Sequence, residues 1–167
     1  MDLKKIIREI PNYPEKGILF RDISTILSNP EAFSFTIEKL GEMITKRKPD
    51  YLAAIEARGF IFAAPLSQIF KIPLIMIRKK GKLPPPVIKI DYSLEYGKDT
   101  LEVSSSVIPK SKNILIIDDI IATGGTVNAS IDLINKTGND VIAVICLMNL
   151  NLYKEPFSVP IESIIDY

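Results

Sequence analysis

The chain has 167 residues, of which 47% are hydrophobic and 25% are charged, a balance typical of one globular domain. Its 21 basic and 20 acidic residues leave a net charge of +1, which argues against a general nucleic-acid binder. The sequence contains no histidine, so histidine-based catalysis and histidine-ligated zinc are excluded. Its one cysteine, Cys146, lies in an apolar run, and we expect it to be a small buried residue in a reducing compartment.

No apolar run reaches the ~20 residues of a membrane-spanning helix. The N-terminal stretch MDLKKIIREIPNYP carries charges throughout, unlike a secretory signal peptide. We therefore expect a cytoplasmic protein that does not contact a membrane.

In chain order, short apolar runs alternate with helical segments. Residues 3–10 have the pattern of a short amphipathic helix that Pro11 ends. Asn29-Pro30-Glu31 is typical of a helix start, with Asn29 as the cap. Beyond Pro49, we expect helices at 59–71 and 126–136, and strands at 51–56, 74–77, 114–117, 141–148 and, as an edge strand, 161–167. The stretch 89–103 contains two half-strands around a loop, and the basic, proline-rich stretch 78–86 is not expected to be regular.

This alternation predicts an α/β fold with a mostly parallel sheet flanked by helices. Open sheets of this kind bind ligands at the carboxyl ends of their strands, so polar residues that follow the strands are the first candidates for a site.

The stretch ILIIDDIIATGGT joins an apolar strand to two carboxylates and a glycine-rich turn. Adjacent strand residues point to opposite faces, so we expect the chain to turn before Asp118 and Asp119 can both reach one ligand. Two carboxylates suit a vicinal diol, a metal ion or a developing positive charge. The turn that follows, Thr123 to Thr126, offers backbone amides and hydroxyls to an anion at a helix start. A sugar phosphate contains both a diol and an anion.

A common nucleotide-binding loop or a plain glycine turn would account for this stretch less well. The chain contains neither Gly-x-x-x-x-Gly-Lys-Ser/Thr nor Gly-x-Gly-x-x-Gly, so the common nucleotide-binding loops are absent from its sequence. A strand exit followed by a plain glycine turn would explain TGGT, but not the two acids before it.

ILIIDDIIATGGT resembles the 5-phosphoribosyl-1-diphosphate signature of the type I phosphoribosyltransferase family. GILFRDIS, EARGF, RKKGKLP and YSLEYG resemble the adenine-specific members of that family, in the family's order. The resemblance runs from about residue 10 to residue 150. It implies one type I phosphoribosyltransferase domain over 1–167, with an N-terminal hood segment at about 1–30 and a flexible loop at about 78–100.

The resemblance implies transfer of the 5-phosphoribosyl group from phosphoribosyl diphosphate to adenine, which gives AMP and diphosphate. Asp118 and Asp119 would hold the ribose hydroxyls. The 5-phosphate would lie on the turn formed by Ala122, Thr123, Gly124, Gly125 and Thr126. Diphosphate would be bound by Ala57 and Arg58, in a loop that often contains a cis peptide in the family, and by Arg78, Lys79 and Lys82.

Base recognition and proton transfer are assigned by the same resemblance. Adenine would contact Leu19, Phe20 and Arg21, with Phe20 stacked on one face and Arg58 on the other. Glu95 and Arg58 are the catalytic candidates, Glu95 as the proton source for adenine, and Tyr96 would pack over the site. Ala63 replaces the family's usual glycine, which we expect to alter helix packing only.

The family also implies Mg²⁺ held mainly by substrate oxygens, with no firm protein ligand, and a homodimer in which Lys79 is a candidate for the neighbouring subunit's site. Another purine base on the same scaffold is the first alternative, and GILFRD and LEYG argue against it. The second is a regulatory module with a DNA-binding domain, for which the segment before Leu19 leaves no room.

Overall fold

The computed structural model describes residues 1–93 and 97–167. The chain forms two compact units, Met1–Lys39 and Leu40–Tyr167, and the division falls within helix α2 (Pro30–Arg47). The expectation of one domain with a hood at about 1–30 and a loop at about 78–100 stays a prediction.

The N-terminal unit is built around a β-hairpin. Strand β1 (Arg8–Pro11) pairs antiparallel with β2 (Leu19–Asp22), and the short helix α1 (Ser24–Leu27) follows. The predicted helix at 3–10 is wrong, because only a single 3₁₀ turn, η1 (Leu3–Lys5), forms before the chain enters β1. Pairing with β2 satisfies the backbone groups of this segment, and an ion pair between Arg8 and Asp22 supports the pairing.

The predicted start of α2 is confirmed. The side-chain oxygen of Asn29 accepts hydrogen bonds from the backbone N–H groups of Glu31 and Ala32, at 3.1 Å each. This contact satisfies two donors that the first turn of a helix leaves unpaired.

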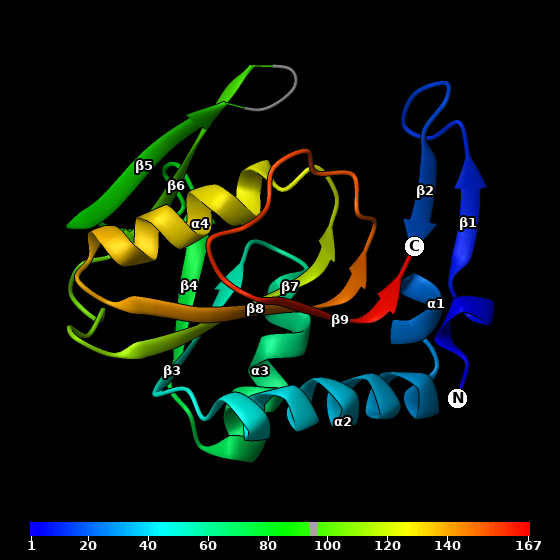
Figure 1. Cartoon of the computed structure of the whole chain (residues 1–167), viewed down its shortest axis with the longest axis horizontal. Helices are drawn as coiled ribbons and strands as arrows, with labels where there is room; N and C mark the ends of the chain where they lie inside the picture. The colour runs from blue at the N-terminus through cyan, green and yellow to red at the C-terminus, as the bar shows by residue number, and fades with distance from the viewer. Residues whose placement is uncertain (94–96) are drawn as a thin grey trace. The chain divides into compact units, whose positions relative to one another are not determined.

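The larger unit contains a seven-stranded sheet with the order β5-β6-β4-β3-β7-β8-β9 (Figure 1). Strands β4, β3, β7, β8 and β9 run parallel, and β6 and β5 complete one end antiparallel. The bounds are β3 (Tyr51–Ile55), β4 (Leu74–Lys79), β5 (Val87–Ser93), β6 (Lys98–Ser104), β7 (Asn113–Ile121), β8 (Asp140–Asn149) and β9 (Ile161–Asp166). The mostly parallel α/β fold is confirmed, as is the edge position of the last strand.

Two helices connect the parallel strands. Helix α3 (Gly59–Phe70) links β3 to β4, and α4 (Gly125–Lys136) links β7 to β8. The two crossovers lead in opposite directions along the sheet, so right-handed connections place α3 and α4 on opposite faces (Figure 1). Pro65 is accommodated inside α3 without ending it.

The core of this unit is made by the central strands and the inner side of α4. Residues 52–55 of β3 and 114–117 of β7 are buried, as expected for parallel strands covered on both faces. Cys146 on β8 is 0% exposed, which confirms its predicted place in the core.

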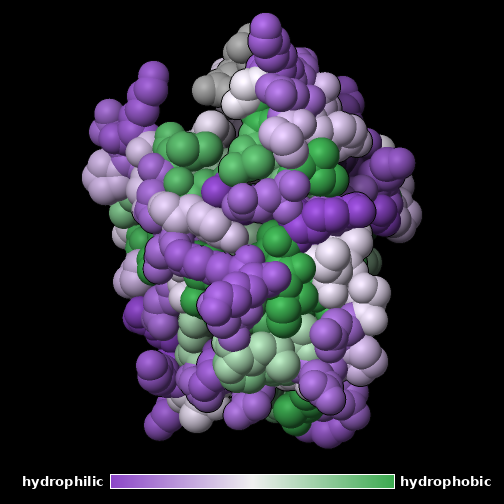
Figure 2. Space-filling view, turned by 90° about the vertical axis from the view of Figure 1, so that its right-hand side faces the viewer, coloured by the Kyte–Doolittle hydropathy of each residue, from purple (hydrophilic) through white to green (hydrophobic). Residues whose placement is uncertain are grey.

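The face shown in Figure 2 is covered mainly by hydrophilic residues, with smaller hydrophobic areas between them. Within residues 1–93 and 97–167, no helix is long and apolar enough to cross a membrane.

Candidate functional site at the carboxyl ends of β3 and β7

Strands β3 and β7 are neighbours in the sheet, but the chain leaves them in opposite directions. From β3 it passes through α3 to β4, and from β7 it passes through α4 to β8. This reversal makes their carboxyl ends the switch point at which open α/β sheets bind ligands. Residues 56–58 and 118–126 therefore meet at one place, although about sixty residues of sequence separate them.

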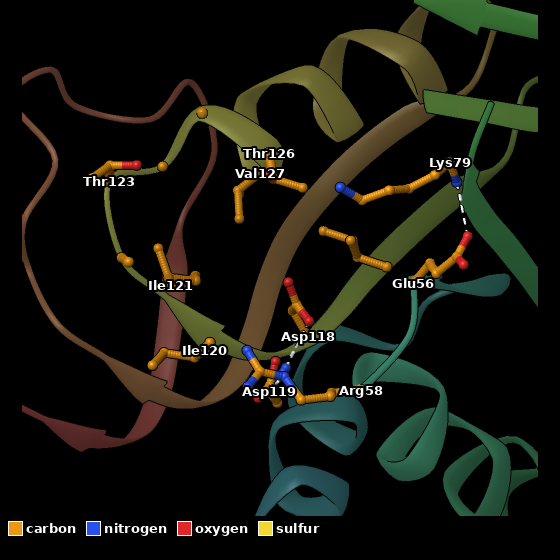
Figure 3. A pocket seen from close by; sticks show the side chains of 14 residues that line it. Glu56, Arg58, Lys79, Asp118, Asp119, Ile120, Ile121, Thr123, Thr126 and Val127 are labelled. Carbon is orange, nitrogen blue, oxygen red and sulfur yellow. Dashed lines mark hydrogen bonds and ion pairs between the residues drawn. The ribbon is translucent and has the colours of Figure 1, made fainter. Parts of the chain in front are cut away.

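A cavity of about 260 Å³ lies at this point (Figure 3). Its walls come from the ends of β3 and β7, from Lys79 on β4, and from the turn that begins α4. The lining residues are Ile55, Glu56, Arg58, Lys79, Asp118, Asp119, Ile120, Ile121, Ala122, Thr123, Gly124, Gly125, Thr126 and Val127. Nine of the predicted site residues are thus together in one unit of the chain, namely Arg58, Lys79, Asp118, Asp119 and the five residues of the turn at 122–126.

Asp118 and Asp119 both line the cavity, but not in the way that the sequence suggested. The expected turn between strand and acids is wrong, because β7 continues to Ile121. The cavity surrounds the end of this strand, so side chains from both of its faces reach it (Figure 3). Asp118 is 9% exposed and Asp119 is 2% exposed.

Burial raises the pKa of the Asp118 carboxyl well above its ordinary value, and the charge of Asp119 raises it further. Burial also raises the pKa of Asp119, although the guanidinium of Arg58 opposes this effect. Keeping both groups ionised is therefore costly in the free protein. A ligand that donates hydrogen bonds to these oxygens would relieve part of that cost.

Arg58 forms an ion pair with Asp119, with Nε 2.9 Å from Oδ2. The N–H group does not point at the oxygen, so the buried Oδ2 of Asp119 lacks an aligned hydrogen-bond donor. Buried carboxylate oxygens rarely remain in this state, which makes Oδ2 an acceptor available to a ligand.

The segment Glu56–Arg58 connects β3 to α3 and contains a cis peptide bond between Glu56 and Ala57. Gly59 follows at the first position of α3 and lies close to β7. A Cβ atom on Gly59 would be 2.8 Å from the carbonyl oxygen of Ile117 and 3.2 Å from Oδ1 of Asp118. The contact between α3 and β7 thus requires a residue without a side chain.

The glycine-rich turn brings the start of α4 to the cavity. Gly124 is buried and has a φ of +84°, a left-handed conformation that favours glycine. Gly125 begins α4, whose first backbone N–H groups have no partners within the helix. These groups and the positive end of the helix dipole lie opposite the two carboxylates and are suited to bind an anion.

Of the basic side chains predicted to bind diphosphate on β4 and after it, Lys79 lines the cavity and Arg78 and Lys82 do not. The side chain of Lys79 extends into the cavity, and its Nζ is 2.5 Å from Oδ2 of Asp99 on β6 (Figure 3). The hydrogen bond to Asp99 raises the pKa of Lys79, so this ammonium stays charged. Arg78 instead forms an ion pair with Glu56, with Nε 3.2 Å from Oε2, and donates to the carbonyl of Lys82.

The Glu56 carboxylate connects the segment after β3 to β4, because it contacts both Arg78 and Lys79. Burial opposes its ionisation, but hydrogen bonds from the backbone N–H of Lys79 and from Arg78 outweigh burial and hold the pKa below its ordinary value. Ala57, Arg78 and Lys82 are not among the residues that line the cavity in the described part of the chain. Their contacts with diphosphate stay predictions.

The predicted adenine-binding residues lie on β2, in the N-terminal unit. Phe20 packs edge-on against Tyr13, with ring centroids 5.1 Å apart, Leu19 is 41% exposed, and Arg21 pairs with Glu9. Their roles in base binding stay predictions. Glu95 and Tyr96 lie outside the described residues.

Sequence reasoning related Gly59 to backbone strain in the loop but missed its close approach to β7; it also missed Asp99 and assigned no role to Glu56. Asp99 has no motif of its own, because its contact with Lys79 depends on how β6 pairs with β4. EARGF contained Glu56 and Gly59, and the glycine after the loop was the available signal for a close approach.

The carboxylates of the cavity suit Mg²⁺ only if the substrate supplies most of the oxygen ligands. In residues 1–93 and 97–167, no group of three or more His, Cys, Asp or Glu side chains could hold a metal ion. Asp118 and Asp119 form a pair, and Arg58 already neutralises part of its charge. Such a site fits Mg²⁺ that takes most of its oxygens from a phosphate-bearing substrate and water.

Two buried carboxylates lie opposite a glycine-rich helix start at the switch point of a parallel sheet, which is the arrangement expected of a phosphoribosyltransferase. The sequence model of the phosphoribosyl transferase domain matches residues 22–159. The chain belongs to this family, and within it to the adenine phosphoribosyltransferases.

Curated relatives support the assignment to the adenine phosphoribosyltransferases. The chain is 44% identical to the adenine phosphoribosyltransferase of Rhodospirillum rubrum, over all of this chain and 99% of that protein. It is 46% identical to that of Trichodesmium erythraeum over the full length of both.

Solved structures agree. The adenine phosphoribosyltransferase of Thermoanaerobacter pseudethanolicus matches with a TM-score of 0.94 and 40% identity, over 99% of this chain and 98% of the other. The Saccharomyces cerevisiae enzyme, solved with an imino-altritol bisphosphate and adenine, matches with a TM-score of 0.88 and 34% identity, over 96% and 94% of the two chains.

Proposed function

We propose that this protein transfers the 5-phosphoribosyl group from phosphoribosyl diphosphate to adenine, forming AMP and diphosphate. The observation that carries the proposal is the cavity in which two buried carboxylates lie opposite a glycine-rich helix start. The match to adenine-specific relatives over the full chain supports adenine as the base.

Each side of the cavity has its own task in this proposal. Asp118 and Asp119 accept hydrogen bonds from the ribose 2- and 3-hydroxyls, and Oδ2 of Asp119 is the acceptor that lacks a donor in the free protein. The turn at 122–126 binds the 5-phosphate through amides and hydroxyls. When the bond from ribose to diphosphate breaks, positive charge grows on the sugar, and the two carboxylates stabilise it.

The opposite wall serves the leaving group. Arg58 and Lys79 reach the cavity as cations and would bind diphosphate, with Ala57, Arg78 and Lys82 nearby in sequence. Mg²⁺, bound with the substrate, would neutralise diphosphate charge and ease its departure. The position of Lys79 in the cavity of its own chain favours a role there over a role in a neighbouring subunit.

Three further parts of the proposal rest on the family resemblance. Leu19, Phe20 and Arg21 would bind adenine, with Arg58 over the other face. Glu95 would supply the proton that the purine gains, and Tyr96 would cover the site. The protein would act as a cytoplasmic homodimer.

The test is to incubate the protein with phosphoribosyl diphosphate, Mg²⁺ and one purine base at a time, and to quantify nucleotide and diphosphate. We expect AMP from adenine, little or no product from hypoxanthine or guanine, and loss of activity with a chelator that added Mg²⁺ reverses. Product from hypoxanthine but not from adenine would refute the base assignment. Tight binding of phosphoribosyl diphosphate without any product would favour a sensor instead of an enzyme.

A further inference from the structure

The connection between β8 and β9, residues 150–160, is irregular throughout yet makes specific contacts. Two of its side chains, Tyr153 and Phe157, pack edge to face, with ring centroids 4.6 Å apart and planes at 64°. Both are partly buried against the core of the larger unit.

This aromatic pair lies directly against the phosphate turn. A Cβ atom on Gly124 would be 2.8 Å from Cζ of Phe157 and 3.3 Å from Cβ of Tyr153. The turn backbone and the rings are therefore in full contact, with no space for a methyl group between them. Figure 1 shows the β8–β9 connection passing beside the turn that precedes α4.

Open space borders the turn in two places. The cavity of about 260 Å³ lies on one side of it. A second hollow of about 310 Å³ adjoins it, lined in part by Thr123, Gly125 and Tyr153. Because glycine-rich backbone beside open space can adopt many conformations, close contact with the aromatic pair restricts the geometry of the turn.

A polar network fixes the aromatic pair in turn. The Tyr153 hydroxyl donates to Oδ1 of Asn151 at 3.0 Å, and Nδ2 of Asn149 donates to the same oxygen at 3.0 Å. Asn149 is 5% exposed and pairs with Ile121 across β7 and β8, immediately before the turn. The backbone N–H of Leu150 donates to the carbonyl of Ile121 at 2.8 Å. The connection is thus anchored at the point where the turn begins.

We propose that Tyr153 and Phe157 are positioning residues for the 5-phosphate of the substrate. They hold Gly124 in its left-handed conformation, so that the amides of the turn are already directed at the phosphate before it binds. The proposal rests on the proposed function, and it concerns the affinity for the phosphate end of the substrate. Adenine and diphosphate contacts are left unchanged.

The main test is Phe157→Ala, with Phe70→Ala as its matched control. Phe70 is also a partly buried ring against a glycine, since a Cβ on Gly41 would be 3.0 Å from it, but it lies between α2 and α3, away from the turn.

Affinity for ribose 5-phosphate is measured by calorimetry, and KM for each substrate and kcat are measured from AMP formation. Phe157→Ala should weaken ribose 5-phosphate about tenfold, equivalent to ~1.4 kcal/mol. KM for phosphoribosyl diphosphate should rise similarly, while KM for adenine changes less than about twofold.

Phe70→Ala should lower Tm and leave affinity for ribose 5-phosphate within about twofold of the wild type. The proposal is overturned if both variants lower Tm but neither weakens ribose 5-phosphate, or if both weaken it equally. It is also overturned if Phe157→Ala affects adenine as much as the phosphate ligand.

Milder variants keep the proposal testable if Phe157→Ala does not fold. Phe157→Leu keeps most of the packing, and Tyr153→Phe removes only the hydroxyl that the network holds. We expect losses of about two- to fivefold in ribose 5-phosphate affinity for each, and unchanged affinity in both would refute the positioning role. Because calorimetry detects phosphate binding without turnover, these outcomes can be read even if the wild-type protein forms no AMP from adenine.

Discussion

Gly59 is the position at which one methyl group should damage both the fold and the site. In Gly59→Ala, the new Cβ would lie 2.8 Å from the carbonyl oxygen of Ile117 and 3.2 Å from Oδ1 of Asp118. The first of these atoms belongs to the backbone of the central strand, so a rotamer change cannot relieve the contact. Either α3 moves away from β7 or the strand end shifts.

The size of the effect follows from this geometry. Overpacking of this kind costs ~1–3 kcal/mol. At ~2–4 °C per kcal/mol for a chain of this size, Tm should fall by roughly 2–12 °C. Because the second contact is to Asp118, KM for phosphoribosyl diphosphate should rise at the same time. Thermal and urea unfolding, together with initial rates at saturating adenine, measure both effects.

Gly41→Ala is the control for this variant. Its Cβ would be 3.0 Å from atoms at the tip of the Phe70 ring, which can move, and it lies inside α2, where alanine is favoured over glycine by ~0.5–1 kcal/mol. We expect Tm within ~2 °C of the wild type and an unchanged KM. A Gly59→Ala protein as stable as the Gly41→Ala protein, with the wild-type KM, would refute the argument from close approach.

Three other predictions address the carboxylates. Asp119→Asn removes the charge that faces Arg58 and the sugar, so KM for phosphoribosyl diphosphate should rise roughly 10- to 100-fold, as for loss of a charged hydrogen bond, with a smaller change in KM for adenine. Hydrogen bonds from Ser24 and the Arg8 guanidinium lower the pKa of Asp22 from 3.8 to about 2, so its ionised form stabilises the folded state above pH 3.8. Asp22→Asn should therefore reduce the free energy of unfolding at pH 7, and the difference from wild type should disappear as the pH falls through about 2; a constant difference would contradict the assignment. Glu95→Ala should lower kcat far more than it weakens phosphoribosyl diphosphate, and equal losses would argue against proton transfer.

The sequence predicted those parts of the site whose functional residues are contiguous in one segment of the chain. In ILIIDDIIATGGT, the strand, the two acids and the helix start are contiguous, so local patterns were enough to place Asp118, Asp119 and the turn on one cavity. The helix cap at Asn29 also depends only on neighbouring residues, and this prediction was confirmed.

The parts that could not be predicted depend on pairing between distant segments. Residues 3–10 have a helical pattern, but a strand forms because β2 offers it backbone partners. Phe157 and Gly124 meet only because β8 and β9 are neighbours in the sheet, and no motif marks the ring that supports the turn. The place of Lys79 likewise depends on Asp99, which strand pairing brings to it.

A crystal structure of the protein with AMP tests the central claim most directly, because it shows where each end of the nucleotide lies. We expect the phosphate on the backbone amides of residues 123–126, and the two ribose hydroxyls within ~2.7–3.2 Å of carboxylate oxygens of Asp118 and Asp119. A phosphate bound elsewhere, or ribose hydroxyls directed away from both carboxylates, would contradict the account.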